Sequence, residues 1–353
     1  MDDLLQFLKS LIRLPGLSGY ETPVRTQIEA AWKPLCDKTS VSKLGSLHAL
    51  KCGNAPEPRP ALLLAAHMDA IGLIVTGVTD GFLRITEIGS LDPRVLPGQP
   101  VIVHGRKQLP GIIVQPPTHL LPEKHRNRPA PLEYLLVDTG LEPGQVSRLV
   151  RTGDLVSFDQ QPIELSEELM VGHTLDNRAS VAALTVCLQI LHGRQLQWDL
   201  WAVASVQEEV AYGGAVTSAF QLRPALAIAI DVTWGSSPGS PAHKTYPIGK
   251  GITLGIGPIA HPHLHKSLKD LAKQLEIPYQ IEAMPRYSAT DADELQVTAE
   301  GIPTMWISIP LRYMHTPVEM VSLVDIERAG RLVAEFSAGL QVDYLDRIKW
   351  DET

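Results

Sequence analysis

The sequence predicts an α/β fold: an α/β/α sandwich with a mixed, mostly parallel sheet, into which a small β-rich domain is inserted. Segments with helical periodicity alternate with short continuous apolar runs near both ends of the chain. Between them, short β-type runs are separated by Gly, Pro and Asp turns. Since 353 residues exceed what one hydrophobic core usually supports, we expect an α/β domain formed by residues 1–70 and 166–353, with the insertion at residues 71–165.

The first 70 residues predict two helices followed by one buried strand. In MDDLLQFLKSLIRLPG, apolar residues recur at three- and four-residue steps, which indicates an amphipathic helix. In ETPVRTQIEAAWKPLC, Thr22 is the expected N-cap and Pro23 the first helical residue. The run RPALLLAAHMD follows the Pro-rich stretch NAPEPRP and predicts a strand that is buried on both faces and delivers His67 at its end.

The inserted region predicts a small barrel. Its β-type runs are GLIVTG, GFLRITEIG, QPVIVHG, GIIVQPP, EYLLVDTG and GDLVSFD, with no helical pattern between them.

Helices and strands alternate again after the insertion. Helices are predicted at LDNRASVAALTVCLQILHG, around KSLKDLAKQLE, and at LVDIERAGRLVAEFSAGL, with Ser322 near the start of the last one. Strands are predicted at DLWAVASVQEE, at the end of AFQLRPALAIAIDVTW, and at TMWISIP. This order is typical of βαβ units and a parallel sheet.

Composition excludes several classes of function. The net charge is −8 and no dense Lys/Arg run occurs, which argues against a nucleic-acid surface. The three cysteines are far apart and form no CxxC pair, so we expect reduced thiols and a cytoplasmic location. The first residues lack signal-peptide features, and no apolar run approaches the roughly 20 residues that cross a bilayer, so no membrane association is expected.

Polar residues of the kinds that bind metals follow the apolar runs, and one more opens a predicted helix. In open α/β sheets, ligands bind at the carboxyl ends of strands, so these residues can converge on one crevice. Imidazoles and carboxylates suit Zn, Mn or Co, and the absence of paired cysteines argues against a structural thiolate zinc. The candidates are His67, Asp69, Asp176, Glu208, Glu209, Asp231 and His315.

Glu208 and Glu209 pose a geometric problem, because adjacent residues of an extended strand point to opposite faces. Both can serve one site only if the chain turns where the strand ends. Gly213 and Gly214 follow within a few residues and are expected to allow that turn.

Six stretches give the chain a resemblance to the di-metal aminopeptidases of peptidase family M42, which includes tetrahedral and glutamyl aminopeptidases. They are HMDAIG, TLDNRAS, VQEEVAYGGA, AIDVT, SATDAD and IPLRYMHTPVEMV, in the family's order and across essentially the whole chain. The resemblance implies a zinc-exopeptidase-like α/β domain with a PDZ-like or barrel insertion that mediates dimerisation.

The resemblance also implies a role for each candidate residue and two divalent metal ions per subunit, Zn or Co with Mn as a third option. His67 and Asp231 would bind one ion, and Glu209 and His315 the other. Asp176 would bridge them. Glu208 would be the general base, and Asp69 would orient His67.

The implied activity is removal of N-terminal residues from short peptides by a homo-oligomer, built from dimers and in many relatives a tetrahedral dodecamer. Two alternatives stay open: another di-metal amide hydrolase of the deacylase or carboxypeptidase type, and a non-catalytic metal-binding scaffold protein. The presence of Glu208 favours an enzyme over a scaffold. A glycosidase is disfavoured, because its two carboxyls must face each other across a sugar.

A few positions depart from the family pattern or lack an implied role. Ala70 replaces an acid, Ala289 replaces a glycine, and VAYGGA replaces the usual VGLRGA. These changes bear on substrate preference rather than on metal ligation. His261, His263 and His265 are expected to form a solvated or substrate-lining patch on a loop or strand edge, not a third metal site.

Overall fold

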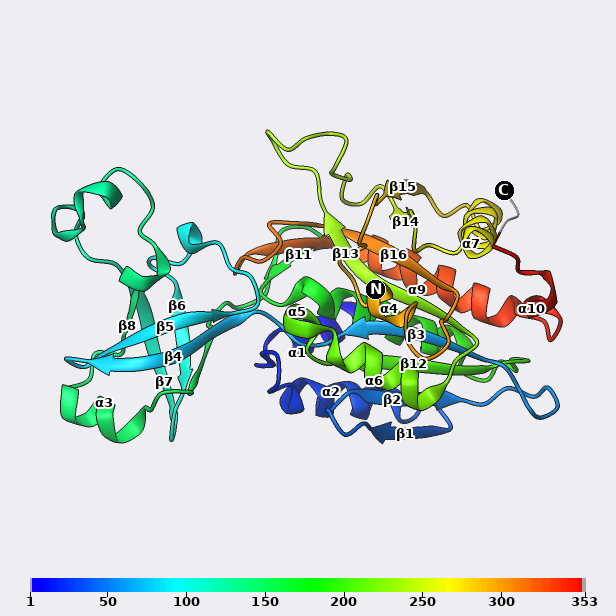
Figure 1. The fold of residues 1–353 in the computed structure, drawn as a ribbon, viewed down its shortest axis with the longest axis horizontal. Helices are drawn as coiled ribbons and strands as arrows, with labels where there is room; N and C mark the ends of the chain where they lie inside the picture. Colours follow the sequence, from blue (N-terminus) through cyan, green and yellow to red (C-terminus); the bar gives the residue numbers. More distant parts are fainter. Residues whose placement is uncertain (1, 351–353) are drawn as a thin grey trace.

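The computed structural model describes residues 2–350 and has two regions (Figure 1). A large α/β domain holds both ends of the described chain. A smaller β-rich region extends to one side of it and is connected through the segments that flank strands β4 and β9. The predicted fold class is confirmed.

The α/β domain is built on an eleven-stranded mixed sheet within the described residues. The order of its main path is β1-β2-β12-β3-β13-β16-β17-β11-β10, and β14 pairs with β16 and β15. The four central strands, β12, β3, β13 and β16, are mutually parallel, whereas the flanking pairs are antiparallel apart from β14 and β15. Strand bounds are β1 Lys38–Val41, β2 Leu47–Lys51, β3 Ala61–His67, β10 Ile163–Glu164, β11 Leu169–Gly172, β12 Asp199–Ser205, β13 Leu226–Trp234, β14 Ile252–Ile256, β15 Tyr279–Ala283, β16 Thr304–Arg312 and β17 Glu319–Ser322.

Helices pack on both faces of this sheet. Helix α4 packs against β3, β13 and α9, and α6 packs against β12 (Figure 1). Helix α8 packs against α6, β13 and β16. The helix bounds are α1 Asp2–Ile12, α2 Thr22–Trp32, α4 Leu175–Leu191, α5 Glu208–Ala211, α6 Gly213–Leu222, α7 Pro262–Gln274, α8 Ala292–Leu295, α9 Leu323–Gly339 and α10 Tyr344–Arg347.

The apolar runs of the sequence form the centre of this sandwich. Residues 62–67 of β3 are buried without interruption, as are residues 226–233 of β13. Strands that are covered by helices on both faces have no solvent side, so their sequences are continuously apolar instead of alternating. The polar residues at their carboxyl ends are therefore placed by a rigid, well-packed scaffold.

The inserted region is a closed six-stranded antiparallel barrel with its own core, in the order β4-β5-β8-β7-β6-β9. The predicted absence of helices is wrong: a short helix, α3 (Pro143–Leu149), and 3-10 turns at residues 93–95, 118–120, 123–125 and 132–134 lie between the strands. The barrel strands are β4 Gly72–Thr79, β5 Phe82–Ile88, β6 Pro100–His104, β7 Gln108–Val114, β8 Leu136–Asp138 and β9 Leu155–Phe158.

Two local predictions need correction. Thr22 is the first residue of α2 rather than its N-cap, which is Glu21. His261, His263 and His265 do not lie on a loop or strand edge, because His261 is the N-cap of α7 and the other two lie in its first turns. The Nδ1 atom of His265 lies 2.8 Å from the Gly255 carbonyl oxygen, so this ring has a structural partner. A proline at the first position of α7 starts the helix earlier than the apolar pattern indicated.

Across residues 2–350, the helices are all too short or too polar to cross a bilayer.

Candidate metal centre

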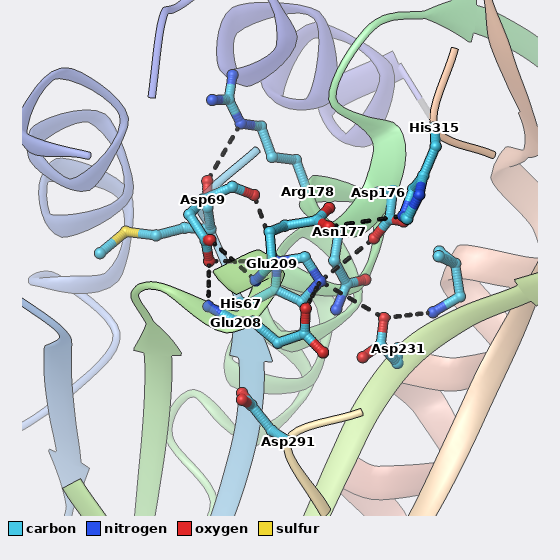
Figure 2. Close-up of polar contacts among 12 residues, drawn as sticks. His67, Asp69, Asp176, Asn177, Arg178, Glu208, Glu209, Asp231, Asp291 and His315 are labelled. Carbon is cyan, nitrogen blue, oxygen red and sulfur yellow. Dashed lines mark hydrogen bonds and ion pairs between the residues drawn. The ribbon is translucent and has the colours of Figure 1, made fainter. Parts of the chain in front are cut away.

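The seven candidate residues lie together at the carboxyl edge of the parallel strands (Figure 2). His67 ends β3, and Asp231 lies near the end of β13. The two glutamates begin α5 just after β12, and His315 follows β16. Asp176 lies in the first turn of α4 and completes the cluster. Parallel neighbours bring these ends to one edge of the sheet, so residues separated by up to 248 positions become neighbours.

The chain turns immediately before the two glutamates. Gln207 has a φ of 60°, a left-handed conformation, and the one-turn helix α5 begins at Glu208. The turn was predicted at Gly213 and Gly214, but these residues begin α6 instead. Gly214 serves a different purpose, because a Cβ there would lie 2.3 Å from the Val206 carbonyl oxygen.

The Asp69 carboxylate anchors α5. Its Oδ1 accepts a hydrogen bond from the Glu208 backbone N–H at 3.0 Å, and its Oδ2 accepts one from the Glu209 N–H at 3.2 Å. Negative charge is favourable at a helix N-terminus, where these N–H groups have no partners within the helix. Asp69 also lies beside His67, whose Nδ1 is 3.4 Å from its Oδ1 and 3.3 Å from its backbone carbonyl oxygen.

Asp176 lies between the two histidines. Its Oδ1 is 3.2 Å from His67 Nε2, and its Oδ2 is 3.3 Å from His315 Nε2. His67 Nε2 is also 3.7 Å from Asp231 Oδ1, and His315 Nε2 is 3.5 Å from Glu209 Oε2. Each imidazole therefore has its own second carboxylate, and the two share Asp176 (Figure 2).

Glu208 lies on the His67 side of the cluster, with its Oε2 3.7 Å from His67 Nε2. Burial raises the pKa of Glu208 well above its ordinary value. The His67 ring opposes this increase, whereas the negative charges of Asp231 and Asp291 add to it. A carboxyl group in this environment accepts a proton more readily than an exposed one.

The donor set fits divalent cations. Asp176, Glu208, Glu209 and Asp231 have buried side chains, and the Oε1 atom of Glu209 has no hydrogen-bond partner. A carboxylate oxygen accepts hydrogen bonds or binds cations, so a buried one without a donor is either protonated or paired with a positive ion. Burial and the Asp176 charge also raise the pKa of Glu209 well above its ordinary value. Two groups have one ligand atom per residue, all within 4.8 Å of one another: His67, Glu208 and Asp231, and His67, Asp176 and Glu209.

Glu319 was missed by the sequence analysis. It is buried at the start of β17, where its Oε2 accepts a hydrogen bond from the Asp176 N–H at 3.0 Å. Its Oε1 accepts one from the His315 N–H at 2.9 Å. One side chain thus fixes the backbone of two candidate ligands that come from distant segments. Its position four residues after His315, within the motif MHTPVEM, was the available signal.

Arg178 and Asp291 are further buried charged residues near the cluster. The Arg178 guanidinium donates hydrogen bonds to the carbonyl oxygens of Leu11 and Leu14, each at 2.6 Å, and so connects α4 to the end of α1. Asp291, which lies in the SATDAD stretch, accepts a hydrogen bond from Ser205, while its Oδ1 has no partner. Burial raises the pKa of Asp291 to about 7.

Three further histidines, His173, His261 and His263, pack against aromatic rings outside the cluster. His173 packs edge-to-face on Phe158, with ring centroids 4.9 Å apart. His261 and His263 pack in the same way against Trp350 and Tyr344.

The fold and the cluster together define the class of protein: an α/β protein with a candidate metal centre of histidines and carboxylates at the carboxyl edge of its sheet.

The family of M42 glutamyl aminopeptidases matches residues 45–332 of the chain. A lysyl aminopeptidase from Pyrococcus furiosus is 33% identical over 333 residues, which cover 93% of this chain and 94% of the relative. The TET aminopeptidase from a marine-sediment archaeon of the Thaumarchaeota has a TM-score of 0.93 at 28% identity, covering 99% of each chain. The TET1 peptidase from Pyrococcus horikoshii, described as assembling into a tetrahedron or a large octahedral shell, has a TM-score of 0.83 at 30% identity and covers 96% of this chain and 100% of its own.

The chain belongs to the M42 aminopeptidase family. It is a peptidase, and the peptidases of this family are metallopeptidases.

Proposed function

We propose that the protein is a di-metal aminopeptidase that removes N-terminal residues from short peptides. His67 and Asp231 would hold one divalent ion, Glu209 and His315 would hold the other, and Asp176 would serve both. The observation that carries this assignment is the position of Asp176, whose two carboxylate oxygens lie 3.2 and 3.3 Å from the Nε2 atoms of the two histidines. A bridging carboxylate needs this division of its oxygens.

The ions, when bound, polarise the scissile carbonyl and lower the pKa of water. Glu208 is the general base: it accepts a proton from the attacking water and later delivers it to the leaving amine. Its burial and its neighbouring carboxylates support this role, because both increase its affinity for a proton. Asp69 holds Glu208 in place through the backbone N–H and orients the His67 ring.

Zn, Co and Mn are the proposed ions. Imidazole nitrogens and carboxylate oxygens suit all three, and the cluster contains no thiolate. The excess of carboxylates also favours a substrate with a free α-amino group, which is positively charged near neutral pH.

The protein is proposed to act as a homo-oligomer built from dimers, with a tetrahedral dodecamer as the larger assembly. The support is its similarity to the Pyrococcus horikoshii peptidase. In a closed shell, folded proteins would not reach the active sites, which fits short peptides as substrates. Light scattering of the purified protein tests this proposal, and a monomer would contradict it. The cytoplasmic location stays a prediction.

The direct test of the activity compares aminoacyl-p-nitroanilides with their N-acetylated forms. We expect turnover of the free-amine substrates only, loss of turnover with a chelator, and recovery when Zn or Co is added. Equal turnover of blocked substrates would favour a deacylase-type amide hydrolase. Turnover that is insensitive to chelation would contradict the metal assignment.

A further inference from the structure

The candidate metal centre lies in a cleft of about 280 Å³. Apart from the ligands and Glu208, this cleft has a wall to which several segments contribute. Ser90 comes from the connection after β5, Tyr212 from the turn after α5, and Ala289 from the loop before α8. Val232, Trp234 and Met314 complete this wall, and we refer to these six residues as the cleft wall.

The cleft wall carries no charge. Within residues 2–350, no Lys or Arg side chain lines the cleft. Tyr212 is the one titratable member of the wall, and burial together with the Glu208 charge raises its pKa, so its phenol stays neutral at ordinary pH. Arg312, which follows the β16 partner of Trp234, donates its Nε–H to the Ser236 carbonyl oxygen and does not line the cleft.

Trp234 provides a large apolar surface at the rim of the cleft. It is the last residue of β13, three positions after Asp231, and 53% of it is exposed. Covering exposed aromatic surface with an apolar group of a ligand lowers the free energy, because both surfaces leave water. Val232 precedes Trp234 by two positions on the same strand, and Met314 precedes the ligand His315. Apolar surface therefore adjoins both halves of the proposed metal centre.

We infer that the cleft wall selects peptides whose N-terminal residue has an uncharged, apolar side chain, which packs against Trp234. This inference rests on the proposed aminopeptidase function and adds its substrate class. Within residues 2–350, an acidic side chain would find no Lys or Arg side chain lining the cleft, and it would lose its hydration against the apolar part of the wall. A basic side chain would lose its hydration against Val232, Trp234 and Met314, and the carboxylates of the cleft are the proposed metal ligands and the proposed base instead of free partners from the wall. Glutamyl and lysyl preferences, for which the family and one relative are named, are therefore not expected here.

The test is a panel of Leu, Met, Ala, Glu and Lys p-nitroanilides with the metal-loaded enzyme. We expect kcat/KM for Leu and Met to exceed the values for Glu and Lys by about tenfold or more, since the mismatch involves a charge. A highest kcat/KM for Glu or Lys would overturn the inference and leave the aminopeptidase function intact. No turnover of any substrate in the panel would instead overturn the proposed function.

Variants of Trp234 test the role of this side chain. Trp234→Ala should lower kcat/KM for the Leu substrate by about tenfold and that for the Ala substrate much less, because only the longer side chain reaches the indole. Trp234→Lys should raise the ratio of Glu to Leu turnover by about tenfold, because it supplies the missing cation. If both variants keep the selectivity of the parent enzyme, Trp234 does not contact the N-terminal side chain.

Phe220→Ala is the matched control. Phe220 is 57% exposed, lies on α6 and does not line the cleft, so its removal should leave the panel unchanged. Light scattering of each variant measures its oligomeric state and so tests a second explanation, in which Trp234 contacts another copy of the chain. Dissociation of Trp234→Ala with unchanged selectivity would overturn the inference in favour of that contact.

Discussion

Two buried clusters, each with one residue on strand β13, differ in how their carboxylate oxygens are used. Glu282 on β15 is 2% exposed and accepts hydrogen bonds from the hydroxyls of Thr233, Thr253 and Ser308. The candidate metal centre, which includes Asp231 two residues before Thr233, instead collects several carboxylates and leaves Glu209 Oε1 without a donor. The Glu282 carboxylate is satisfied by neutral donors, whereas the candidate metal centre leaves an acceptor free for a cation.

The largest expected effect comes from removing the proposed base. Glu208→Gln should lower kcat by about a thousandfold, because the amide cannot accept the proton from water. Metal content, measured by elemental analysis, should stay at the parent level, since Glu208 is not a proposed ligand. Turnover near the parent value would show that another group takes the proton.

Removal of metal from the candidate centre should lower the stability of the folded protein strongly. At a metal concentration of 100 times Kd, binding stabilises the folded state by about 3 kcal/mol. Thermal unfolding with a chelator and with added Zn measures this difference. The Glu282→Ala variant should show the same metal-dependent shift, because the Glu282 cluster has no proposed ion. A Tm of the parent protein that is independent of metal would indicate that the candidate metal centre, like the Glu282 cluster, binds no ion.

Glu282→Ala should lower the free energy of unfolding by about 2 kcal/mol, since three hydroxyls lose their acceptor in the interior. Denaturant unfolding measures the loss. Turnover per folded molecule should remain near the parent value, in contrast to Glu208→Gln. Loss of turnover without a loss of stability would indicate that the Glu282 cluster acts on the active site.

Glu319→Gln tests the residue that connects Asp176 and His315. The amide can accept only through its one oxygen, so one of the two backbone N–H groups loses its partner. We expect metal affinity to fall by about tenfold, as is common when a group that supports a ligand is changed. Competition with a chromogenic chelator measures the affinity, and circular dichroism checks that the fold is retained. Unchanged affinity would limit Glu319 to a structural role.

His48 should produce the smallest effect. Burial lowers the pKa of His48 from 6.5 to about 4, and its Nδ1 has no partner. Between pH 6.5 and about 4, His48 is protonated in the unfolded chain but neutral in the folded chain. The free energy of unfolding is therefore highest above pH 6.5 and decreases as the pH falls towards 4. Between about pH 7 and about pH 5.5, the loss should be about 1 kcal/mol. Denaturant unfolding of His48→Gln should show a shallower pH dependence, and an identical slope would assign the loss to other groups.

The sequence alone predicted the fold class because the strongest signals were long and local. The continuous apolar run that became β3 and the amphipathic pattern that became α1 specify burial directly. Elements with weaker patterns were missed, such as the two-residue strand β10 and the short helix α3. Short elements depend on their neighbours more than on their own residues, so their sequences carry little signal.

Residue types and their positions, after apolar runs or for Asp176 at the start of a helix, indicated seven candidate residues, and the family resemblance supplied their proposed roles. The tertiary structure decided how they meet. The turn lies at Gln207, and the Asp69 carboxylate accepts hydrogen bonds from both glutamate N–H groups. Glu319 accepts hydrogen bonds from the backbone N–H groups of Asp176 and His315. The cleft wall around Trp234 also became visible only there. The physical reason is that a sequence specifies which side chains are available and buried, whereas distances between separate segments depend on how the strands pair in the sheet.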